Sequence, residues 1–453
     1  MSKLAIFNGP KVRTKYFPPQ TNISEEEEKA VMRVMKSKVL SGYRGSYQKE
    51  FFGYVECQAV EKEFSEKFGT TYAISCNSAS TGLLIALGAC GIGNGDEVIV
   101  SPYSMDVSAT SPLWWNSVPV FSDLDNYYCI SNDSIKKKIN RSTKVILPVS
   151  LFGDIYDFRT INHLAKMSNL YTVADESQAI GSYFQYPDGT KKWCGSLADL
   201  NVFSGTFGKT IFAGEFGIIL TNNSDLARRC QLIKNHACAV LSSMESDEVR
   251  NRFADNMDNN MLGSNFRCTE MVAAVMREQL KKLDKIVEVK RERVKYLHEG
   301  LKQIPAITPS PVREGTYHNY YVDSYLWDSD KADGLQRDVF VNAVKAELTP
   351  SIDRIDRGVC LGNGYIQPLY RNPLFRRRKL YGGTDFPFNL ATTDLNKNYS
   401  PEEHPVVEKY WKDTLFLSLY HLLDLQKEDM DDIINAFCKV WDNRKELSQR
   451  KVL

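Results

Sequence analysis

Residues 200–221 read LNVFSGTFGKTIFAGEFGIILT, and the fold of the chain is best inferred from this stretch outward. The first five and last five residues are short apolar runs, which are typical of buried strands. Glycines surround Lys209 in the turn between the two runs, so the backbone there can approach a ligand closely. The second run follows the first as the return of a hairpin would. We therefore expect one antiparallel strand in an otherwise parallel sheet.

Short β-rich runs also precede this stretch, and amphipathic segments such as 80–90 and 158–169 separate several of them. Strands that alternate with helical segments form βαβ units, which build a mostly parallel sheet with helices on both faces. We expect a seven-stranded sheet from the runs YAIS (72–75), EVIVS (97–101), PVFSD (119–123), KVILPVS (144–150), LYTVAD (170–175), LNVFS (200–204) and GIILT (217–221).

The rest of the chain indicates a second, smaller α+β domain. Apolar residues recur at helical spacing from Glu270 to about Ile304, which predicts one long helix. The stretch from Ile366 to Asn389 is rich in proline and arginine and resembles an irregular loop. Beyond the long helix, we expect a strand within 319–327 and helices within 334–348 and 429–441. The predicted division is an N-terminal arm (1–40), a large α/β domain (41–285) and a small C-terminal domain (286–453).

Composition places the chain among ordinary globular enzymes. It has 453 residues, enough for two packed domains, and a net charge of +1, which argues against nucleic-acid and membrane-surface binding. No apolar run approaches the ~20 residues that span a bilayer, and no signal peptide is evident. The ten cysteines form no CxxC pair, and the six histidines are too dispersed for a metal cluster read from spacing. We expect reduced thiols, no metal and a cytoplasmic protein.

In open α/β sheets, ligands bind at the carboxyl ends of the strands, so the residues that follow each strand are the candidates for chemistry. After the first strand, Ser80 and Thr81 lead directly into a helix. The free N–H groups of a helix N-terminus, with these two hydroxyls, could hold a phosphate group. The alternative is an ordinary serine or threonine cap, which is common.

Two further strand ends carry residues that suit a pyridoxal 5'-phosphate (PLP) site. Asp175 ends the run LYTVAD, with Gln178 close behind, and a carboxylate there could keep a pyridine nitrogen protonated. Ser204 ends the run LNVFS, and Lys209 follows in the glycine-rich turn. Lysine is suited to imine formation because a buried amine readily loses its charge. Taken singly, Asp175 could be a helix cap and Lys209 a surface lysine.

The joint occurrence of these residues is far more specific than any one of them. Three strand ends supply, in chain order, a phosphate cradle, a partner for a pyridine nitrogen and an imine-forming amine. The motifs GxGxxG after the first strand, GxxxxGK[ST], HExxH and GxSxG do not occur. The combination predicts PLP as the cofactor.

At this point the sequence resembles the DegT/StrS-type sugar aminotransferases, a PLP-dependent family of fold type I, over nearly its whole length. The segment GNGDEVIVSPYS (93–104) resembles the family's GDEVI strand and turn, and VPVFSDLD (118–125) its PVF segment. The other similar segments are ADESQAIGS (174–182), FSGTFGKTIFAGEFG (203–217), GSNFRCTEMVAAVMREQL (263–280), PLYRNPLF (368–375) and EEHPVVEKYWKDTLFLSLY (402–420).

The resemblance implies a role for each matching residue. Lys209 would bind the cofactor as a Schiff base and move protons at the substrate carbon. Asp175 would pair with the pyridine nitrogen, and Gln178 would approach the 3'-oxygen of the ring.

The phosphate ligands implied by the resemblance come from two subunits. Ser80, Thr81 and Ser204 would hold the phosphate, and Asn265 would reach it from the neighbouring subunit. This last role implies a homodimer with shared active sites.

Three positions bear on the substrate. Met105 stands where the family stacks an aromatic ring on PLP, and Tyr103 is close enough to take that place instead. Phe216 replaces a family glycine, and we expect its bulky side chain where the substrate binds.

The resemblance implies ping-pong amino transfer through pyridoxamine phosphate. The donor would be L-glutamate or L-glutamine, and the acceptor a keto sugar, nucleotide-linked, or a cyclic ketose. Two alternatives stay open: a PLP-dependent sugar dehydratase, a branch in which histidine replaces the lysine, and a regulatory homologue without turnover. Candidates for binding anionic groups, or else for solvated surface charge, are Arg267, Arg371, Arg376, Arg377 and Arg378.

Overall fold

The computed structural model describes residues 3–20, 22–44, 49–237 and 261–449 of the chain. A seven-stranded sheet forms its centre, in the order β1-β9-β8-β5-β4-β2-β3. β9 runs antiparallel to both of its neighbours, whereas the other neighbouring strands pair in parallel. The strands are β1 (Tyr72–Cys76), β2 (Glu97–Val100), β3 (Val118–Phe121), β4 (Thr143–Leu147), β5 (Tyr171–Asp175), β8 (Leu200–Ser204) and β9 (Gly217–Thr221). The predicted mostly parallel sheet, with one reversed strand, is confirmed.

Helices cover both faces of this sheet, so its strands are buried almost throughout. Alternate residues of β9 show the two faces: Ile219 packs with Leu83 of α3, whereas Ile218 packs with Phe64 of α2. Such burial on both faces explains why these strands read as continuous apolar runs. The helices of this part are α1 (Glu25–Ser37), α2 (Val55–Phe68), α3 (Ala79–Ala89), α4 (Val107–Thr110), α5 (Asn132–Lys138), α6 (Phe158–Met167) and α7 (Ser224–Lys234).

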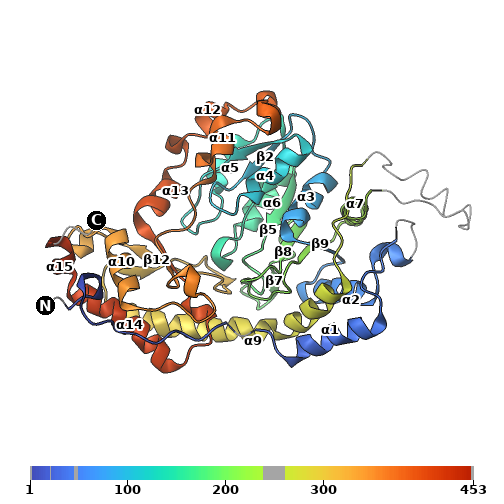
Figure 1. Ribbon diagram of the computed structural model, residues 1–453. Coiled ribbons are helices and arrows are strands. Elements are labelled where there is room, and N and C mark those ends of the chain that lie inside the picture. Colours follow the sequence, from blue (N-terminus) through green and yellow to red (C-terminus); the bar gives the residue numbers. More distant parts are fainter. Residues whose placement is uncertain (1–2, 21, 45–48, 238–260, 450–453) are drawn as a thin grey trace, which may run out of the picture.

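Helix α9 (Glu270–Leu301) joins the two halves of the molecule, and it runs beneath both of them in Figure 1. It begins at the expected residue and ends at Leu301 rather than Ile304. Its buried stripe includes Leu280, Leu283 and Val287 in the first half and Val294, Leu297 and Leu301 in the second. The first half packs against α1 and α2, and the second against α14 (Lys427–Asp442).

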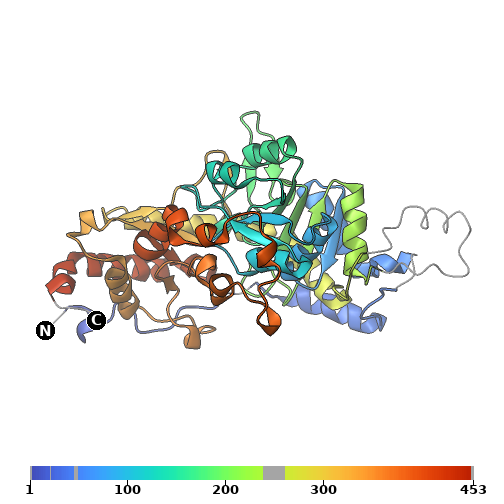
Figure 2. The ribbon, with the colours of Figure 1, turned by 90° about the horizontal axis from the view of Figure 1, so that it is seen from above.

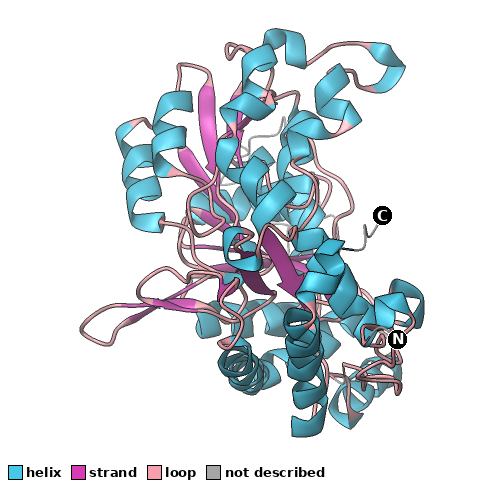
Figure 3. Cartoon of the chain, turned by 90° about the vertical axis from the view of Figure 1, so that its left-hand side faces the viewer, coloured by secondary structure: helices cyan, strands magenta, loops and turns pink. Residues whose placement is uncertain are grey.

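A four-stranded antiparallel sheet, in the order β10-β12-β14-β13, forms the second half with α10 (Arg337–Glu347), α14 and α15 (Arg444–Gln449). The N-terminal segment packs here too, since Leu4 and Phe17 share a buried cluster with Phe340 of α10. Figure 2 shows the C-terminal elements at one end of an elongated molecule, and Figure 3 shows helices around the strands. The strands are β10 (Ile307–Pro309), β12 (Asp323–Trp327), β13 (Leu361–Gly362) and β14 (Leu415–Ser418), and a separate small sheet contains β6 (Tyr183–Gln185), β7 (Lys191–Trp193) and β11 (Thr316–Tyr317).

The stretch from Ile366 to Asn389 is not the irregular loop that its composition suggested. It contains α11 (Pro373–Arg377) and short 3-10 turns, and α12 (Leu395–Asn398) and α13 (Pro405–Lys409) follow it. The ring of Phe375 lies 5.2 Å from that of Phe121, at the end of β3. Burial of such aromatic side chains against the sheet edge orders this proline- and arginine-rich stretch. The predicted domain boundary at 285 falls inside α9, and the division of the chain stays a prediction.

Two further observations concern the described residues only. No helix among them is long and apolar enough to cross a membrane. The nine cysteines in the described ranges are free thiols, and eight of them are buried.

Candidate active site

The strand register brings the predicted site residues to one edge of the sheet. Gly217, the first residue of β9, pairs with Cys76 on one side and with Ser204 on the other. Asp175 at the end of β5 pairs with Val202 of β8. Neighbouring strands lie about 4.8 Å apart, so the ends of β1, β8 and β5 fall within a few strand spacings of one another.

The N-terminus of α3 provides a place for a phosphate group. Ser78 caps the helix, and its hydroxyl accepts the N–H of Thr81 at 3.2 Å. The N–H groups of the first helical turn have no partner within the helix, and the positive end of the helix dipole favours an anion there. Ser80 is exposed at this terminus, whereas the Thr81 hydroxyl donates to Asn77 at 2.6 Å.

Gly217 is required for this arrangement. A side-chain carbon on this glycine would lie 2.2 Å from the carbonyl oxygen of Ser78, closer than atoms can approach. The last glycine of the motif GEFG therefore lets the start of α3 lie directly over the start of β9. Ser204, which pairs with Gly217, is buried, and its hydroxyl accepts the N–H of Thr206 at 3.4 Å.

Asp175 is buried at the end of β5, with both carboxylate oxygens engaged. The Ser108 hydroxyl donates to one oxygen at 3.0 Å, and the Ser177 N–H donates to the other at 3.1 Å. Ser108 comes from α4, in the connection that follows β2. These two donors fix the carboxylate at the sheet edge.

Gln178 is held between the two halves of the chain. Its side-chain oxygen accepts the N–H of Phe152 at 2.7 Å, and its amide nitrogen donates to the Tyr365 hydroxyl at 3.2 Å. The Tyr365 N–H in turn donates to the Tyr103 hydroxyl at 3.0 Å. Burial raises the pKa of the Tyr365 phenol above its ordinary value, so this hydroxyl keeps its proton at neutral pH.

Lys209 is buried in the turn between β8 and β9, with only 8% of its surface exposed. Gly208 precedes it with φ of +87°, in the left-handed region that favours glycine. The Lys209 amine lies 4.7 Å from the centre of the Tyr321 ring. Asn319 connects this ring to the loop after β5, since its side chain accepts the Tyr321 N–H at 2.9 Å and donates to the Gln178 carbonyl at 3.0 Å.

Two predicted cofactor contacts stay predictions: Met105 or Tyr103 against the PLP ring, and Asn265 against the phosphate bound to the other subunit. Met105 is half exposed in the connection after β2, whereas Tyr103 is fully buried and bonded to Tyr365. Asn265 is exposed, and its side chain accepts the N–H of Arg267 at 3.4 Å.

Phe216 is not at the substrate position expected from the sequence. Its side chain is 1% exposed, and its ring lies 5.9 Å from that of Phe64 on α2. It shares this cluster with Ile218 and Leu220, which lie two and four residues further on and on the same face of the sheet. The phenylalanine therefore belongs to the core between the sheet and α2.

Of the candidate arginines, Arg371 is engaged elsewhere. It forms a two-pronged pair with Glu408, with both nitrogen–oxygen distances 2.7 Å. Burial raises the pKa of Glu408, but hydrogen bonds led by that from Arg371 outweigh it and lower this pKa to about 2. Arg267 donates to Asn235 at 3.0 Å. The remaining three lie on and just after α11, and Arg376 and Arg377 are exposed there.

Four residues of this region were not singled out in the sequence. Ser108, Tyr321 and Tyr365 touch predicted site residues from distant segments, and no local motif marks them. Glu176 follows Asp175 directly and is fully buried, with one oxygen bonded to the Gly195 N–H and the other without a partner among the described residues. Burial, and then the charge of Asp175, raise the pKa of Glu176 to about 8, although the Gly195 bond opposes them.

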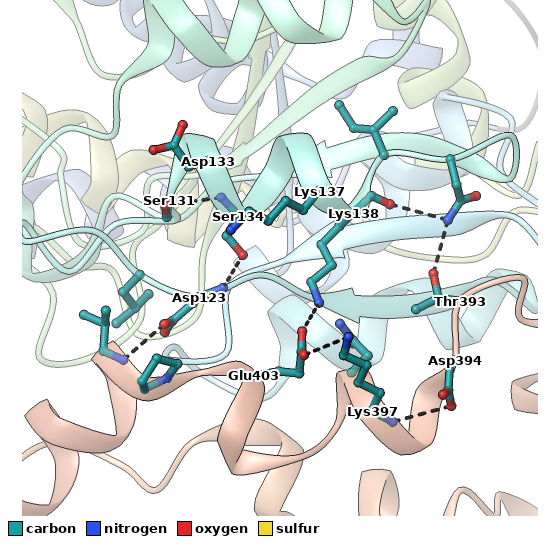
Figure 4. A pocket seen from close by; sticks show the side chains of 16 residues that line it. Asp123, Ser131, Asp133, Ser134, Lys137, Lys138, Thr393, Asp394, Lys397 and Glu403 are labelled. Carbon is teal, nitrogen blue, oxygen red and sulfur yellow. Dashed lines mark hydrogen bonds and ion pairs between the residues drawn. The ribbon is translucent and has the colours of Figure 1, made fainter.

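A separate cavity of about 640 Å³ lies between α5 and the segment 393–406, at the β3 edge of the sheet (Figure 4). Lys138 and Lys397 both point toward Glu403, at nitrogen–oxygen distances of 2.8 Å and 3.4 Å. The Asp123 carboxylate accepts the N–H groups at the start of α13. These paired charges fasten the C-terminal segment to the sheet, and no predicted site residue lines the cavity.

The residues at the sheet edge fit PLP. The exposed N-terminus of α3 suits the phosphate, and the buried Asp175 carboxylate suits a protonated ring nitrogen. Lys209 is buried in the turn that follows β8, the strand next to β5. Gly217 leaves the space that brings the helix terminus to the same edge.

Comparison with known proteins agrees with this arrangement. The sequence profile of the DegT/DnrJ/EryC1/StrS aminotransferase family matches residues 21–389, and the chain belongs to this family. It is 28% identical to the L-glutamine:2-deoxy-scyllo-inosose aminotransferase of Streptomyces fradiae over 97% of this chain and 98% of that protein. The fold matches the aminotransferase from Psychrobacter cryohalolentis with a TM-score of 0.76, at 24% identity, over 95% of this chain and 99% of that one. It also matches DesI, solved with its TDP-sugar product, with a TM-score of 0.76, at 20% identity, over 99% of both chains.

The fold is therefore fold type I, and the chain is a PLP-dependent aminotransferase. The family and the cofactor predicted from the sequence are confirmed. The individual roles of the site residues stay predictions.

Proposed function

We propose that the protein moves an amino group from L-glutamine or L-glutamate to the carbonyl carbon of a keto sugar or a cyclic ketose. The observation that carries this proposal is the buried Lys209 amine, at the sheet edge that also holds Asp175 and the α3 N-terminus. The relative that spans 97% of this chain aminates a cyclic ketose, and DesI binds a TDP-sugar, so both acceptor classes are candidates.

Each residue has a defined part in this reaction. PLP, when bound, stabilises negative charge at the substrate carbon that carries the nitrogen. Lys209 holds the cofactor between turnovers and then moves the proton at that carbon. Asp175, fixed by Ser108, would keep the ring nitrogen protonated, and Gln178 would contact the 3'-oxygen of the ring. Ser80, Thr81 and Ser204 bind the phosphate around the start of α3.

The site is proposed to be completed in a homodimer in the cytoplasm. Asn265 of one protomer would contact the phosphate bound to the other. In its own chain, the Phe266 carbonyl accepts the N–H of Asn77 at 2.9 Å, so the segment carrying Asn265 lies beside the start of α3. Retention of Lys209, where a dehydrating branch of the family has histidine, weighs against sugar dehydration.

Two half-reactions test the proposal. Holoenzyme mixed with L-glutamine or L-glutamate alone should convert its PLP to pyridoxamine phosphate and release one equivalent of the matching keto acid. The aminated enzyme is then mixed with an inosose or with a nucleotide-linked keto sugar, and the aminated product is identified by mass spectrometry. The acceptor class that converts pyridoxamine phosphate back to PLP is the substrate class. Failure of both amino acids to form pyridoxamine phosphate would contradict the proposal.

A further inference from the structure

A cavity of about 460 Å³ lies behind the turn that carries Lys209, between the N-terminal segment and α9. Six of its lining residues come from α9, and four come from the segment that leads into α1 and from the first turn of that helix. The charged residues of the lining are Lys282, Lys285, Lys290 and Arg293 on α9, together with Glu26 and Asp424.

Two of its four cations have carboxylate partners, and two do not. Lys282 pairs with Glu27 at 2.7 Å, and Arg293 pairs with Asp424 at 3.0 Å. Within the described part of the chain, neither Lys285 nor Lys290 makes an ion pair. Lys285 is exposed at the cavity, whereas Lys290 is only 4% exposed.

Lys290 is thus a buried cation without a counter-charge, which is costly unless something balances it. Its amine makes one hydrogen bond within the described residues, of 3.1 Å, to the Thr210 hydroxyl. In the absence of a counter-ion, burial lowers the pKa of Lys290 to about 7. An anion in the cavity would restore the charged form.

Thr210 is the residue after Lys209, so Lys290 reaches the catalytic turn directly. The Thr210 carbonyl also accepts the side-chain N–H of Asn22 at 3.3 Å. Gln279, three turns before Lys290 on α9, donates to the Asn22 carbonyl at 2.7 Å and accepts the Phe212 N–H at 3.3 Å. The same elements that line the cavity therefore hold the backbone that directly follows Lys209.

We propose that this cavity binds a small oxyanion, a phosphate or a carboxylate, through Lys290 and Lys285, and that the bound anion steadies the turn carrying Lys209. The volume suits a small ligand. Lys285 and Lys290 lie five positions apart on α9 and both line the cavity, so one anion bound there has two unpaired cations beside it. The site is distinct from the phosphate cradle at α3 and goes beyond the proposed function.

Titration calorimetry of the PLP-loaded protein with inorganic phosphate, and separately with succinate, tests the proposal and distinguishes the two anion classes. Lys290→Met keeps most of the length of the unbranched side chain and removes its charge, and Lys285→Gln removes the charge of an exposed position. Each of these two substitutions should weaken binding of the preferred anion at least about tenfold, because each removes one charge-assisted hydrogen bond. Lys281→Gln is the matched control, because Lys281 is an exposed lysine of α9 outside the cavity, and it should bind as the unmodified protein does.

A spectroscopic readout tests the link to Lys209. The anion should change the visible circular dichroism of the bound cofactor in the unmodified protein and in Lys281→Gln, but not in Lys290→Met. Binding that persists unweakened in both Lys290→Met and Lys285→Gln would place the anion elsewhere and overturn the proposal. Absence of binding by either anion, or equal competition by chloride, would also overturn it.

Discussion

The amide of Gln178 donates a 3.2 Å hydrogen bond to the hydroxyl of Tyr365, although the two residues lie 187 positions apart. Gln178 follows β5 of the central sheet, and Tyr365 lies between β13 and α11. The bond therefore joins the cofactor edge of the sheet to the second half of the chain. It also fixes which way the Gln178 amide faces, because Phe152 holds the other end of that amide.

Replacing Tyr365 with phenylalanine should loosen Gln178 without disturbing the packing of the ring. The lost bond is worth about 0.5–1.5 kcal/mol, so kcat/KM should fall about 3- to 10-fold and the visible band of the cofactor should shift. Steady-state kinetics and absorption spectra of the holoenzyme measure both. Tyr381→Phe removes a hydroxyl from a residue that is 92% exposed, and it should change neither. An unaltered rate and spectrum in Tyr365→Phe would remove Tyr365 from the site.

Asp175→Asn should be far more damaging than loss of the serine that supports it. The asparagine keeps the shape of the side chain but cannot balance a protonated ring nitrogen, so kcat should fall by about 10²–10³-fold. Ser108→Ala removes one of two donors to the carboxylate, and we expect a loss of about tenfold or less. Equal losses in the two variants would contradict the role given to the charge of Asp175.

Glu176→Gln should make stability less dependent on pH. Between pH 4.5, the ordinary pKa of a glutamate, and about 8, the buried Glu176 keeps its proton while the unfolded chain has released it. Its contribution to stability is therefore fully present below pH 4.5 and is lost as the pH rises toward 8. The variant lacks this loss, and its advantage should grow through the same window, by a few kcal/mol at most.

Urea unfolding of both proteins at several pH values measures that difference. The matched control is Glu292→Gln, an exposed carboxyl on α9, which should follow the unmodified protein. A parallel pH dependence of the unmodified protein and Glu176→Gln would show that Glu176 is ionised in the folded state.

Truncation to alanine should lower the stability of the protein at Phe216 and the retention of PLP at Met105. Phe216→Ala empties a core position beside Phe64 and should cost about 3–5 kcal/mol of unfolding free energy. Met105→Ala removes a half-exposed side chain, should change stability by about 0.5 kcal/mol or less, and should weaken PLP retention. Denaturant unfolding and dialysis of the holoenzyme separate the two effects. A stable Phe216→Ala protein with altered substrate preference would return Phe216 to the substrate site.

The fold could be predicted largely from the sequence because the sheet is parallel and buried on both faces. Runs such as LNVFS (200–204) are then continuous and easy to recognise, and the glycine-rich connection after Ser204, which holds no helical segment, marks the reversed strand. The stretch around α11 was harder, since its order comes from rings such as Phe375 that pack on a distant strand end.

The site could be predicted only where its residues follow strands. Asp175, Gln178 and Lys209 occupy such positions, whereas Tyr321 and Tyr365 reach them by tertiary packing that leaves no local pattern. Phe216 could have been placed correctly, because it shares the two-residue period of Ile218 and Leu220 on the core face of β9. Phe216 was instead assigned to the substrate site because it replaces a glycine of the family motif.

The identity of the cofactor lysine is tested most directly by borohydride reduction of the holoenzyme, followed by peptide mass mapping. We predict the added mass of reduced PLP on the peptide containing Lys209 and on no other. Lys209→Ala should lose this label together with formation of pyridoxamine phosphate, whereas Lys290→Met should keep the label. A label on another lysine, or transamination that survives in Lys209→Ala, would contradict the assignment of Lys209.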